Sequence, residues 1–221
     1  MIGLICLSVT TLRAQESNCK PSKVGLRLSS YTFSYDDSGR LEEVVDNSDN
    51  HYVLIYGADG KVQRMNYLED GELLEWMIFK GKDIQTADGD GSYETYRYES
   101  GENGFPVKVS IVYPNGEITY VEELTWDNGN IIEIKGYKPG EEPKISKFKY
   151  DDKPNPLRVL RSTIDYIGGF NYAEVLSANN IADVNIPGET KYSVPIEYTD
   201  SGCPTLMSIN RDRKGYKKIT Y

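Results

Sequence analysis

The sequence contains a single histidine, His51, and only three cysteines among its 221 residues. Serine–histidine and cysteine–histidine catalysis both need a positioned imidazole. His51 stands between Asn50 and Tyr52 at the start of an expected strand, where a surface residue is the ordinary interpretation. A tetrahedral zinc site needs more nitrogen and sulfur ligands than this chain offers. We therefore expect no catalytic residue and no metal site.

The chain also lacks an excess of positive charge, a long apolar run and a nucleotide-binding motif. Its 25 basic and 34 acidic residues give a formal charge of −9. An acidic surface repels phosphate groups, which argues against nucleic acid and anionic membranes as partners. No stretch after the first fourteen residues approaches the ~20 apolar residues of a transmembrane segment. No glycine-rich phosphate motif opens a helix, so we expect no cofactor.

Tyrosine is abundant, with 18 copies, and it recurs in a hairpin pattern. From Tyr31 to Leu41 the chain alternates aromatic and polar residues, reaches an Asp-rich turn ending at Gly39, and continues with basic and aliphatic residues. A similar unit runs from Tyr56 through Gly60. Alternation places every second side chain on one face of a strand. Glycine supplies the positive φ of a type I turn closed by a G1 bulge.

Shorter turn signals continue the pattern along the chain. Asn-Gly pairs at 115–116 and 128–129 lie between alternating segments, which is the strongest short hairpin signal. A further unit spans 196–204, and alternation at 216–221 indicates a final strand. The sequence therefore predicts an all-β fold, a single antiparallel, twisted and curved meander sheet of consecutive hairpins. An open half-barrel is one form that such a sheet takes.

The segment from 150 to 187 breaks the hairpin pattern. Pro154 and Pro156 remove ladder donors, which argues against a central strand, so we expect a loop there. One short helix is expected near 171–179. This irregular and helical insertion, about 151–187, is expected to cover one open end or face of the sheet. No Pro/Ser-rich linker divides the chain, so we expect a single domain.

The first fourteen residues are apolar, and small Ala14 precedes Gln15, which is typical of a secretory signal peptide and its cleavage site. A buried N-terminal strand is the alternative. We expect residues 15–221 to form the mature domain in an extracytoplasmic location, whether periplasmic, cell-surface or secreted. If the true start of the chain lies upstream, a lipid anchor at Cys6 is a further alternative, because the preceding residues loosely resemble a lipobox.

Cys19 and Cys203 remain as a pair once the leader is removed. An oxidising compartment favours disulfides between such cysteines. A bridge would close a very long loop, which chain-entropy models value at up to ~5 kcal/mol. From the sequence alone, a Cys19–Cys203 disulfide and two free thiols are equally expected.

The segment from Tyr31 to Leu41 resembles a YD repeat of the Rhs type. The match rests on Tyr35-Asp36, Gly39-Arg40 and Leu41. Rhs proteins wind many such repeats into a closed β-shell around a toxin. This chain has too few repeats to enclose cargo, so the resemblance implies β-hairpins and no toxin shell.

A second resemblance covers roughly residues 24–221. In length and order the chain is similar to a family of secreted or lipid-anchored proteins of unknown function common in Bacteroides-like bacteria. The match is carried by three segments, 150–157, 176–181 and 198–204. It implies an extracytoplasmic β-protein and transfers no catalytic residue.

Acidic side chains raise two further possibilities, a calcium-binding loop and a glycosidase pair of carboxylates, and the sequence argues against both. Residues 88–94 alternate oxygen-bearing side chains as a calcium loop does, but Tyr93 stands where an EF-hand requires glycine. An acidic, glycine-rich loop is the better interpretation. Adjacent carboxylates such as Asp36-Asp37 are frequent. The two acids of a glycosidase, however, are separated in space rather than adjacent in sequence.

The aromatic side chains are the remaining candidates for binding. Rings along a sheet can form a platform for sugars or peptides, although cross-strand packing, worth up to ~1 kcal/mol for each pair, accounts for them more simply. The candidate ligand contacts are Tyr35, Tyr56, Tyr67, Trp76, Tyr98, Tyr113 and Trp126.

These features favour a non-enzymatic binding or scaffold protein of the bacterial envelope, with a glycan, a peptide or an envelope protein as its partner. Two alternatives stay open. One is a carbohydrate-active hydrolase that uses carboxylates on the open sheet face. The other is an envelope carrier whose curved sheet holds a lipid-like ligand beneath the helical segment. The ligand and the oligomeric state do not follow from the sequence.

Overall fold

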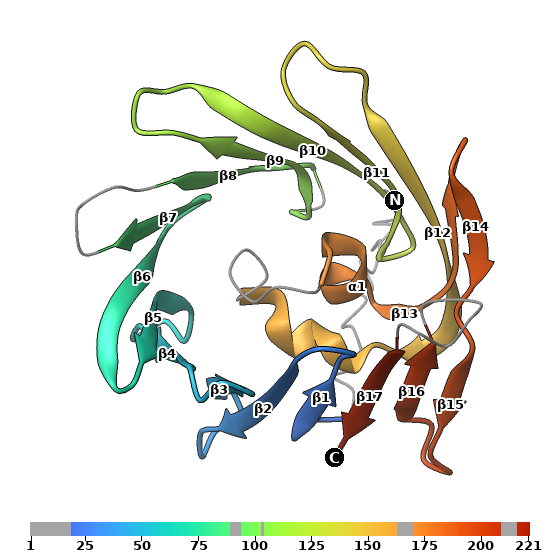
Figure 1. The fold of residues 1–221 in the computed structure, drawn as a ribbon, viewed down its shortest axis with the longest axis horizontal. Coiled ribbons are helices and arrows are strands. Elements are labelled where there is room, and N and C mark those ends of the chain that lie inside the picture. The colour runs from blue at the N-terminus through green and yellow to red at the C-terminus, as the bar shows by residue number, and fades with distance from the viewer. Residues whose placement is uncertain (1–18, 89–93, 103, 163–169, 209–215) are drawn as a thin grey trace, which may run out of the picture.

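The computed structural model describes residues 19–88, 94–102, 104–162, 170–208 and 216–221. Within these residues the chain forms one antiparallel sheet of seventeen strands, with two short helices. The sheet curves around the helices, as Figure 1 shows. The all-β meander predicted from the sequence is thereby confirmed. The expected signal peptide at 1–14 and most of the acidic loop at 88–94 lie outside the described residues.

The strands follow one another around the sheet. Their bounds are β1 Lys23–Gly25, β2 Ser30–Tyr35, β3 Leu41–Asp46, β4 His51–Tyr56, β5 Val62–Glu69, β6 Glu72–Lys80, β7 Asp83–Asp88, β8 Thr95–Ser100, β9 Pro106–Val112, β10 Ile118–Asp127, β11 Asn130–Tyr137, β12 Lys144–Pro154, β13 Asn179–Ile186, β14 Thr190–Ser193, β15 Ile196–Tyr198, β16 Pro204–Ser208 and β17 Tyr216–Thr220.

Each strand pairs with the next from β1 to β14 and again from β15 to β17. The first strand, β1, also pairs with the last, β17. The described pairings stop at β14 and resume at β15, so the sheet is not closed. The first and last strands therefore lie side by side, and the opening in the sheet lies between β14 and β15.

Alternation in the first hairpin produces a buried face, as the sequence predicts. Tyr31 and Phe33 of β2 are 7% and 5% exposed, and Tyr35 packs against the same core. The intervening Thr32 and Ser34 are exposed. Since successive side chains of a strand point to opposite faces, the aromatic residues of β2 all face inward.

The turn of this hairpin follows from its Asp and Gly residues. The Asp36 carboxylate accepts hydrogen bonds from the backbone N–H groups of Ser38 at 3.0 Å and Arg40 at 2.8 Å. Gly39 has a φ of 76°, a conformation that costs most residues energy. The strand register shifts at the end of β2. These are the features of a type I turn closed by a bulge.

The Asn-Gly turn between β10 and β11 is shorter. Asn128 has a φ of 47° and Gly129 a φ of 78°. Two successive positive φ values define the type I′ turn, whose twist matches that of the flanking strands. The hairpin predicted at 128–129 is confirmed.

The structure corrects the prediction of a loop at the start of the 151–187 segment. Strand β12 continues to Pro154, and β13 returns the chain to the sheet at Asn179. The register between β12 and β13 shifts on both sides of Tyr150. Pro154 therefore lies where regular ladder bonding is already interrupted, and its missing N–H costs little.

Two short helices occupy the concave side of the sheet. The 3-10 helix η1 spans Pro156–Ser162, and α1 spans Tyr172–Leu176, within the helix predicted near 171–179. Asn171 caps α1, because its side chain accepts a hydrogen bond from the Glu174 N–H at 3.0 Å. α1 contacts η1, β11 and β13, and Figure 1 shows it surrounded by strands.

The core lies between these helices and the inner face of the sheet. Leu157 and Leu160 of η1 are each 1% exposed, and Ala173 and Val175 of α1 are fully buried. Burying one such leucine contributes roughly 2 kcal/mol. Apolar contacts with the inner face of the sheet therefore hold the helices in place.

Candidate ligand-binding cavity

A cavity of about 390 Å³ lies between α1 and the inner face of the sheet. Its apolar lining includes Phe148, Phe170, Ile181, Val184, Tyr192 and Met207. Its polar lining includes Ser146, Asn171, Glu174 and Lys217, and Tyr192 adds a hydroxyl group. Pockets that bind small molecules have this size range, with mainly apolar walls and a few placed polar groups.

Lys217 forms the polar centre of the cavity. It lies on β17, where Lys217 and Ile219 are buried and their neighbours are exposed. The Lys217 side chain is 2% exposed, its ammonium donates a hydrogen bond to Glu174 Oε1, and it lies 4.6 Å from the centroid of the Phe170 ring. A buried ammonium is costly unless it is paired. Glu174 supplies the balancing charge.

The start of α1 holds Glu174 in position. Oε1 accepts from Lys217, and Oε2 accepts from the backbone N–H of Asn171 at 3.0 Å. This second bond completes a capping box with Asn171. Both carboxylate oxygens are thus engaged, whereas an ammonium carries three N–H donors. The Glu174 side chain is 15% exposed and that of Lys217 2%, so the carboxylate is the more accessible member of the pair.

Asn155 anchors the end of α1. It is 4% exposed. Its Nδ2 donates to the carbonyl oxygens of Glu174 at 2.6 Å and Ser177 at 3.0 Å, and its Oδ1 accepts from the Leu157 N–H at 3.0 Å. The last carbonyls of a helix lack partners within the helix. Asn155 satisfies two of them and so fixes the helix that carries Glu174.

Ser177 and Tyr150 join the same helix to β11. Ser177 Oγ donates to the Tyr150 hydroxyl at 2.9 Å and accepts from the Ile131 N–H at 3.0 Å. The Tyr150 hydroxyl donates to the Ile131 carbonyl at 2.5 Å. Burial raises the pKa of Tyr150 well above its usual value, so this hydroxyl keeps its proton. The contacts form a continuous polar link from α1 to the sheet.

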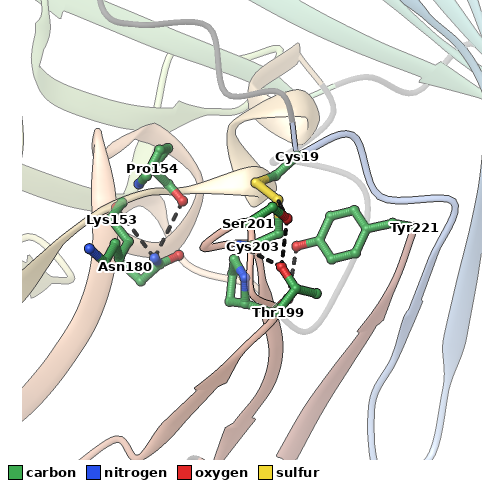
Figure 2. The surroundings of a disulfide bond; sticks show 9 residues. Cys19, Lys153, Pro154, Asn180, Thr199, Ser201, Cys203 and Tyr221 are labelled. Carbon is green, nitrogen blue, oxygen red and sulfur yellow. Dashed lines mark hydrogen bonds between the residues drawn. A yellow bond between two sulfur atoms is a disulfide. The ribbon is translucent and has the colours of Figure 1, made fainter.

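Asn180 supports the irregular end of β12. It is 1% exposed, and its Nδ2 donates to the carbonyl oxygens of Lys153 and Pro154, both at 3.3 Å. Figure 2 shows these contacts near the disulfide. The Asp151 carboxylate accepts from Asn180 Nδ2 at 3.2 Å and from the Tyr198 hydroxyl. The segments at 150–157 and 176–181 thus supply a polar framework next to the cavity.

Cys19 and Cys203 form a disulfide, with Cα atoms 5.5 Å apart (Figure 2). It joins the segment before β1 to the turn between β15 and β16. Close by, the Tyr221 hydroxyl donates to the Pro204 carbonyl at 2.8 Å. Since β1 pairs with β17 and β17 with β16, the covalent link spans the region where the first and last strands meet.

The seven candidate aromatic side chains are spread around the sheet. They lie on β2, β4, β5, β6, β8 and β10 and in the turn after β9. The five that pack against the core are Tyr35, Tyr56, Tyr67, Tyr98 and Trp126. None of the seven lines the cavity described above. The structure therefore does not bring them together into one platform.

Most of these rings have structural contacts. The Tyr56 hydroxyl donates to the Leu41 carbonyl and the Trp126 indole N–H to the Pro106 carbonyl, each at 2.6 Å. Tyr113 is 42% exposed. The remaining contacts are Tyr35 with the Pro21 carbonyl at 2.7 Å, Tyr67 with the Tyr52 ring at 5.2 Å, Trp76 with the Arg64 guanidinium at 5.2 Å, and Tyr98 with the Tyr172 ring at 6.3 Å. Such contacts stabilise a sheet.

The sequence interpretation missed Lys217 and Glu174. One signal was present, because alternation at 216–221 puts Lys217 on the same face as Ile219. A lysine at an inward position is almost never fully buried without a partner. That signal predicts a buried ion pair but does not identify Glu174, which lies on a different element.

His51 lies at the start of β4. Its Nδ1 is 2.8 Å from Glu43 Oε1 on β3, and its Nε2 is 3.7 Å from Asp49 Oδ1. The hydrogen bond to Glu43 raises the pKa of His51 above its ordinary value. Because both side chains are about one-third exposed, this pair contributes little to stability.

The replacement His51→Ala is expected to lower the free energy of unfolding by about 0.2–1 kcal/mol near pH 5.5 and by less near pH 9. The pKa of His51 is raised on folding, so the protonated ring stabilises the fold below its unfolded pKa. That contribution is lost as the pH rises through the folded pKa. Urea denaturation at both pH values measures the difference. An equal loss at both would contradict the assignment.

Among the described residues, no three histidine, cysteine or acidic side chains gather as metal ligands would. The same part of the chain contains no helix long and apolar enough to cross a membrane.

Comparison with known proteins finds similar folds among solved structures. No protein-family model matches the sequence, and no curated protein matches it. The chain is similar to a porin-like protein from Bacteroides uniformis ATCC 8492, with 11% identity, coverage of 90% of this chain and 97% of that chain, and a TM-score of 0.61. A porin-like protein from Bacteroides vulgatus ATCC 8482 has 13% identity, coverage of 91% and 98%, and a TM-score of 0.48. At such low identity the first similarity shows a shared fold, and the second adds no argument.

Proposed function

We propose that the protein is a non-enzymatic binding protein of the bacterial envelope and that the cavity at Lys217 is its binding site. The observation that carries this proposal is the cavity itself, whose lining combines apolar side chains with the ion pair of Lys217 and Glu174. Small-molecule sites combine these features. An extracytoplasmic location is supported by the Cys19–Cys203 disulfide, since such bridges persist in oxidising compartments. The apolar segment at 1–14 supports it as a signal peptide.

The cavity suits a binding role better than glycoside hydrolysis. Glycosidases use two carboxyl groups about 5–9.5 Å apart, on either side of the scissile bond. Glu174 is the one carboxylate among the described residues that line this cavity. Both of its oxygens accept hydrogen bonds from other groups of the protein. Glu174 therefore serves as the structural counter-ion of Lys217.

The position of the two helices argues against a carrier of long-chain lipids. The helices η1 and α1 occupy the concave side of the sheet, where the sequence interpretation placed a lipid-like ligand. The partly open cavity of about 390 Å³ that remains between α1 and the sheet suits a small molecule.

Binding can be tested by NMR with a panel of small amphiphiles, oligosaccharides and short peptides. We expect amide signals of α1 and β13 to shift with at least one member of the panel. The replacement Val184→Trp fills the cavity with a side chain from its own wall and should abolish those shifts. Shifts of equal size in the filled variant, or none with any compound, would contradict the proposed site.

Location is tested separately. The full chain, expressed in a Bacteroides-type host, is expected in the periplasmic, surface or secreted fraction, with a mature N-terminus at Gln15. A cytoplasmic protein that retains residues 1–14 would overturn the proposed location.

A further inference from the structure

We infer that Arg158 and Arg161 of η1 form a second binding site, which takes a doubly charged oxyanion such as a phosphate group. This site goes beyond the proposed function, because neither arginine lines the cavity at Lys217. The inference follows from the face of η1 that carries the two side chains, from the burial of Arg158 and from the lack of a carboxylate partner among the described residues.

The two arginines share one face of η1. A 3-10 helix has three residues per turn, so side chains at positions i and i+3 lie one above the other, about 6 Å apart along the axis. Leu157 and Leu160, on another face, are each 1% exposed and hold η1 against the core. η1 contacts α1 inside the curve of the sheet, as Figure 1 shows. Packing therefore fixes the backbone that carries both arginines.

The Arg158 guanidinium is held partly out of water. The Arg158 side chain is partly buried, and Arg161 is exposed. Burial lowers the pKa of Arg158, and the neighbouring charge of Arg161 lowers it further. Both effects show that a positive charge is costly at this position. A bound anion would remove that cost.

No described carboxylate compensates the two charges. In the part of the chain that the structure describes, the ion pairs belong to other basic residues, and neither guanidinium has a hydrogen-bond partner. Burial raises the pKa of Tyr56 on β4, and the charges of Asp36 and Arg161 also act on it. Asp36 thus lies in the same region, but it is bound to Arg40, with 2.6 Å between Oδ2 and Nη2. The donors of Arg158 and Arg161 are therefore open to a ligand.

Two uncompensated positive charges match one doubly charged oxyanion. Guanidinium groups bind carboxylate and phosphate oxygens through paired, charge-assisted hydrogen bonds. A carboxylate would leave one positive charge unbalanced, whereas a phosphate group near neutral pH carries almost two negative charges. The whole chain has a formal charge of −9, so long-range attraction does not favour anions. Binding has to rest on these local contacts.

Titration with inorganic phosphate tests the site, with sodium chloride keeping the ionic strength constant. We expect the side-chain Nε–H signals of two arginines to shift in NMR spectra, and Arg158→Gln and Arg161→Gln identify them by removing one signal each. In calorimetric titrations each variant should bind phosphate at least about tenfold more weakly, since it loses charge-assisted hydrogen bonds. Acetate should bind the unmodified protein more weakly than phosphate.

Arg97→Gln is the matched control. Arg97 is exposed on β8, 3.3 Å from Asp83, so its replacement changes the net charge equally without touching η1. Its affinity for phosphate should equal that of the unmodified protein. An equal loss in Arg97→Gln and Arg161→Gln would show that phosphate responds to net charge alone and would overturn the site.

Methyl phosphate distinguishes the source of the anion. Binding tighter than that of inorganic phosphate would assign the site to a phosphate ester, and equal or weaker binding would assign it to the free ion. Acetate binding as tightly as phosphate would overturn the double charge. If neither arginine variant folds, the unmodified protein still decides the matter, because arginine signals that do not shift with phosphate reject the site. The Val184→Trp test of the cavity at Lys217 is independent of that result.

Discussion

Replacement of Cys19 and Cys203 by alanine is expected to lower the free energy of unfolding by about 5 kcal/mol. The two residues are 184 positions apart. In the chain-entropy description, a cross-link that closes a loop of this length restricts the unfolded chain by about that amount, and losses of about 2–5 kcal/mol are typical for native disulfides. For a protein of this size the melting temperature should fall by about 10–20 °C.

Calorimetry with and without a reductant measures the effect. The reductant should lower the melting temperature of the unmodified protein and leave that of the double variant unchanged. A double variant that melts within about 3 °C of the unmodified protein would show that the bridge contributes little.

Removal of the disulfide should destabilise the strands next to it more than the rest of the sheet. The disulfide holds the segment before β1, which is short and pairs with β2 and β17. Hydrogen exchange is expected to increase in β1 and β17 of the double variant more than in β10, which lies between two long neighbours. An equal increase in all three strands would show that the bridge acts through global stability alone.

The replacement Asn155→Ala is expected to destabilise the protein by about 3 kcal/mol. The Asn155 side chain is buried and makes hydrogen bonds to the carbonyls of Glu174 and Ser177 and to the Leu157 N–H. Each buried polar group left without a partner costs about 1–3 kcal/mol, and partial rearrangement reduces the sum. Because the same bonds hold α1, ligand affinity at Lys217 should fall as well.

Asn115→Ala provides the matched control for Asn155→Ala. Asn115 lies in an exposed turn, where its Oδ1 accepts a hydrogen bond from the Glu117 N–H at 2.9 Å. Its loss is expected to cost at most about 1 kcal/mol, because water can replace the lost partner. Urea denaturation measures both variants. Equal losses would show that burial of Asn155 has no special importance.

The hairpins could be predicted from the sequence because their causes are local. Asp36 and Gly39 define a turn within five residues, and the alternation of β2 determines which side chains are buried. The Asn128-Gly129 turn follows from two residues alone. The prediction failed at Pro154, because the effect of a proline on a strand depends on whether its neighbour needs a hydrogen bond there. That need is decided by the register of β13.

The cavity could not be predicted from the sequence, because its parts come from distant positions. Lys217 and Glu174 are 43 residues apart, and neither position carries a motif. The aromatic residues singled out in the sequence lie on other strands and outside the cavity. Their spacing predicts strands correctly, yet it does not show which side chains meet across the sheet.

The sequence by itself determined the class of fold, the positions of the regular turns and the short helix near 171–179, because hydrogen bonding and side-chain alternation act over a few residues. Only the tertiary structure decided that this helix lies on the concave side of the sheet, that β1 pairs with β17 and that Cys19 reaches Cys203. The same holds for the cavity at Lys217. A buried ammonium needs a partner, and only the curvature of the sheet brings Glu174 to it.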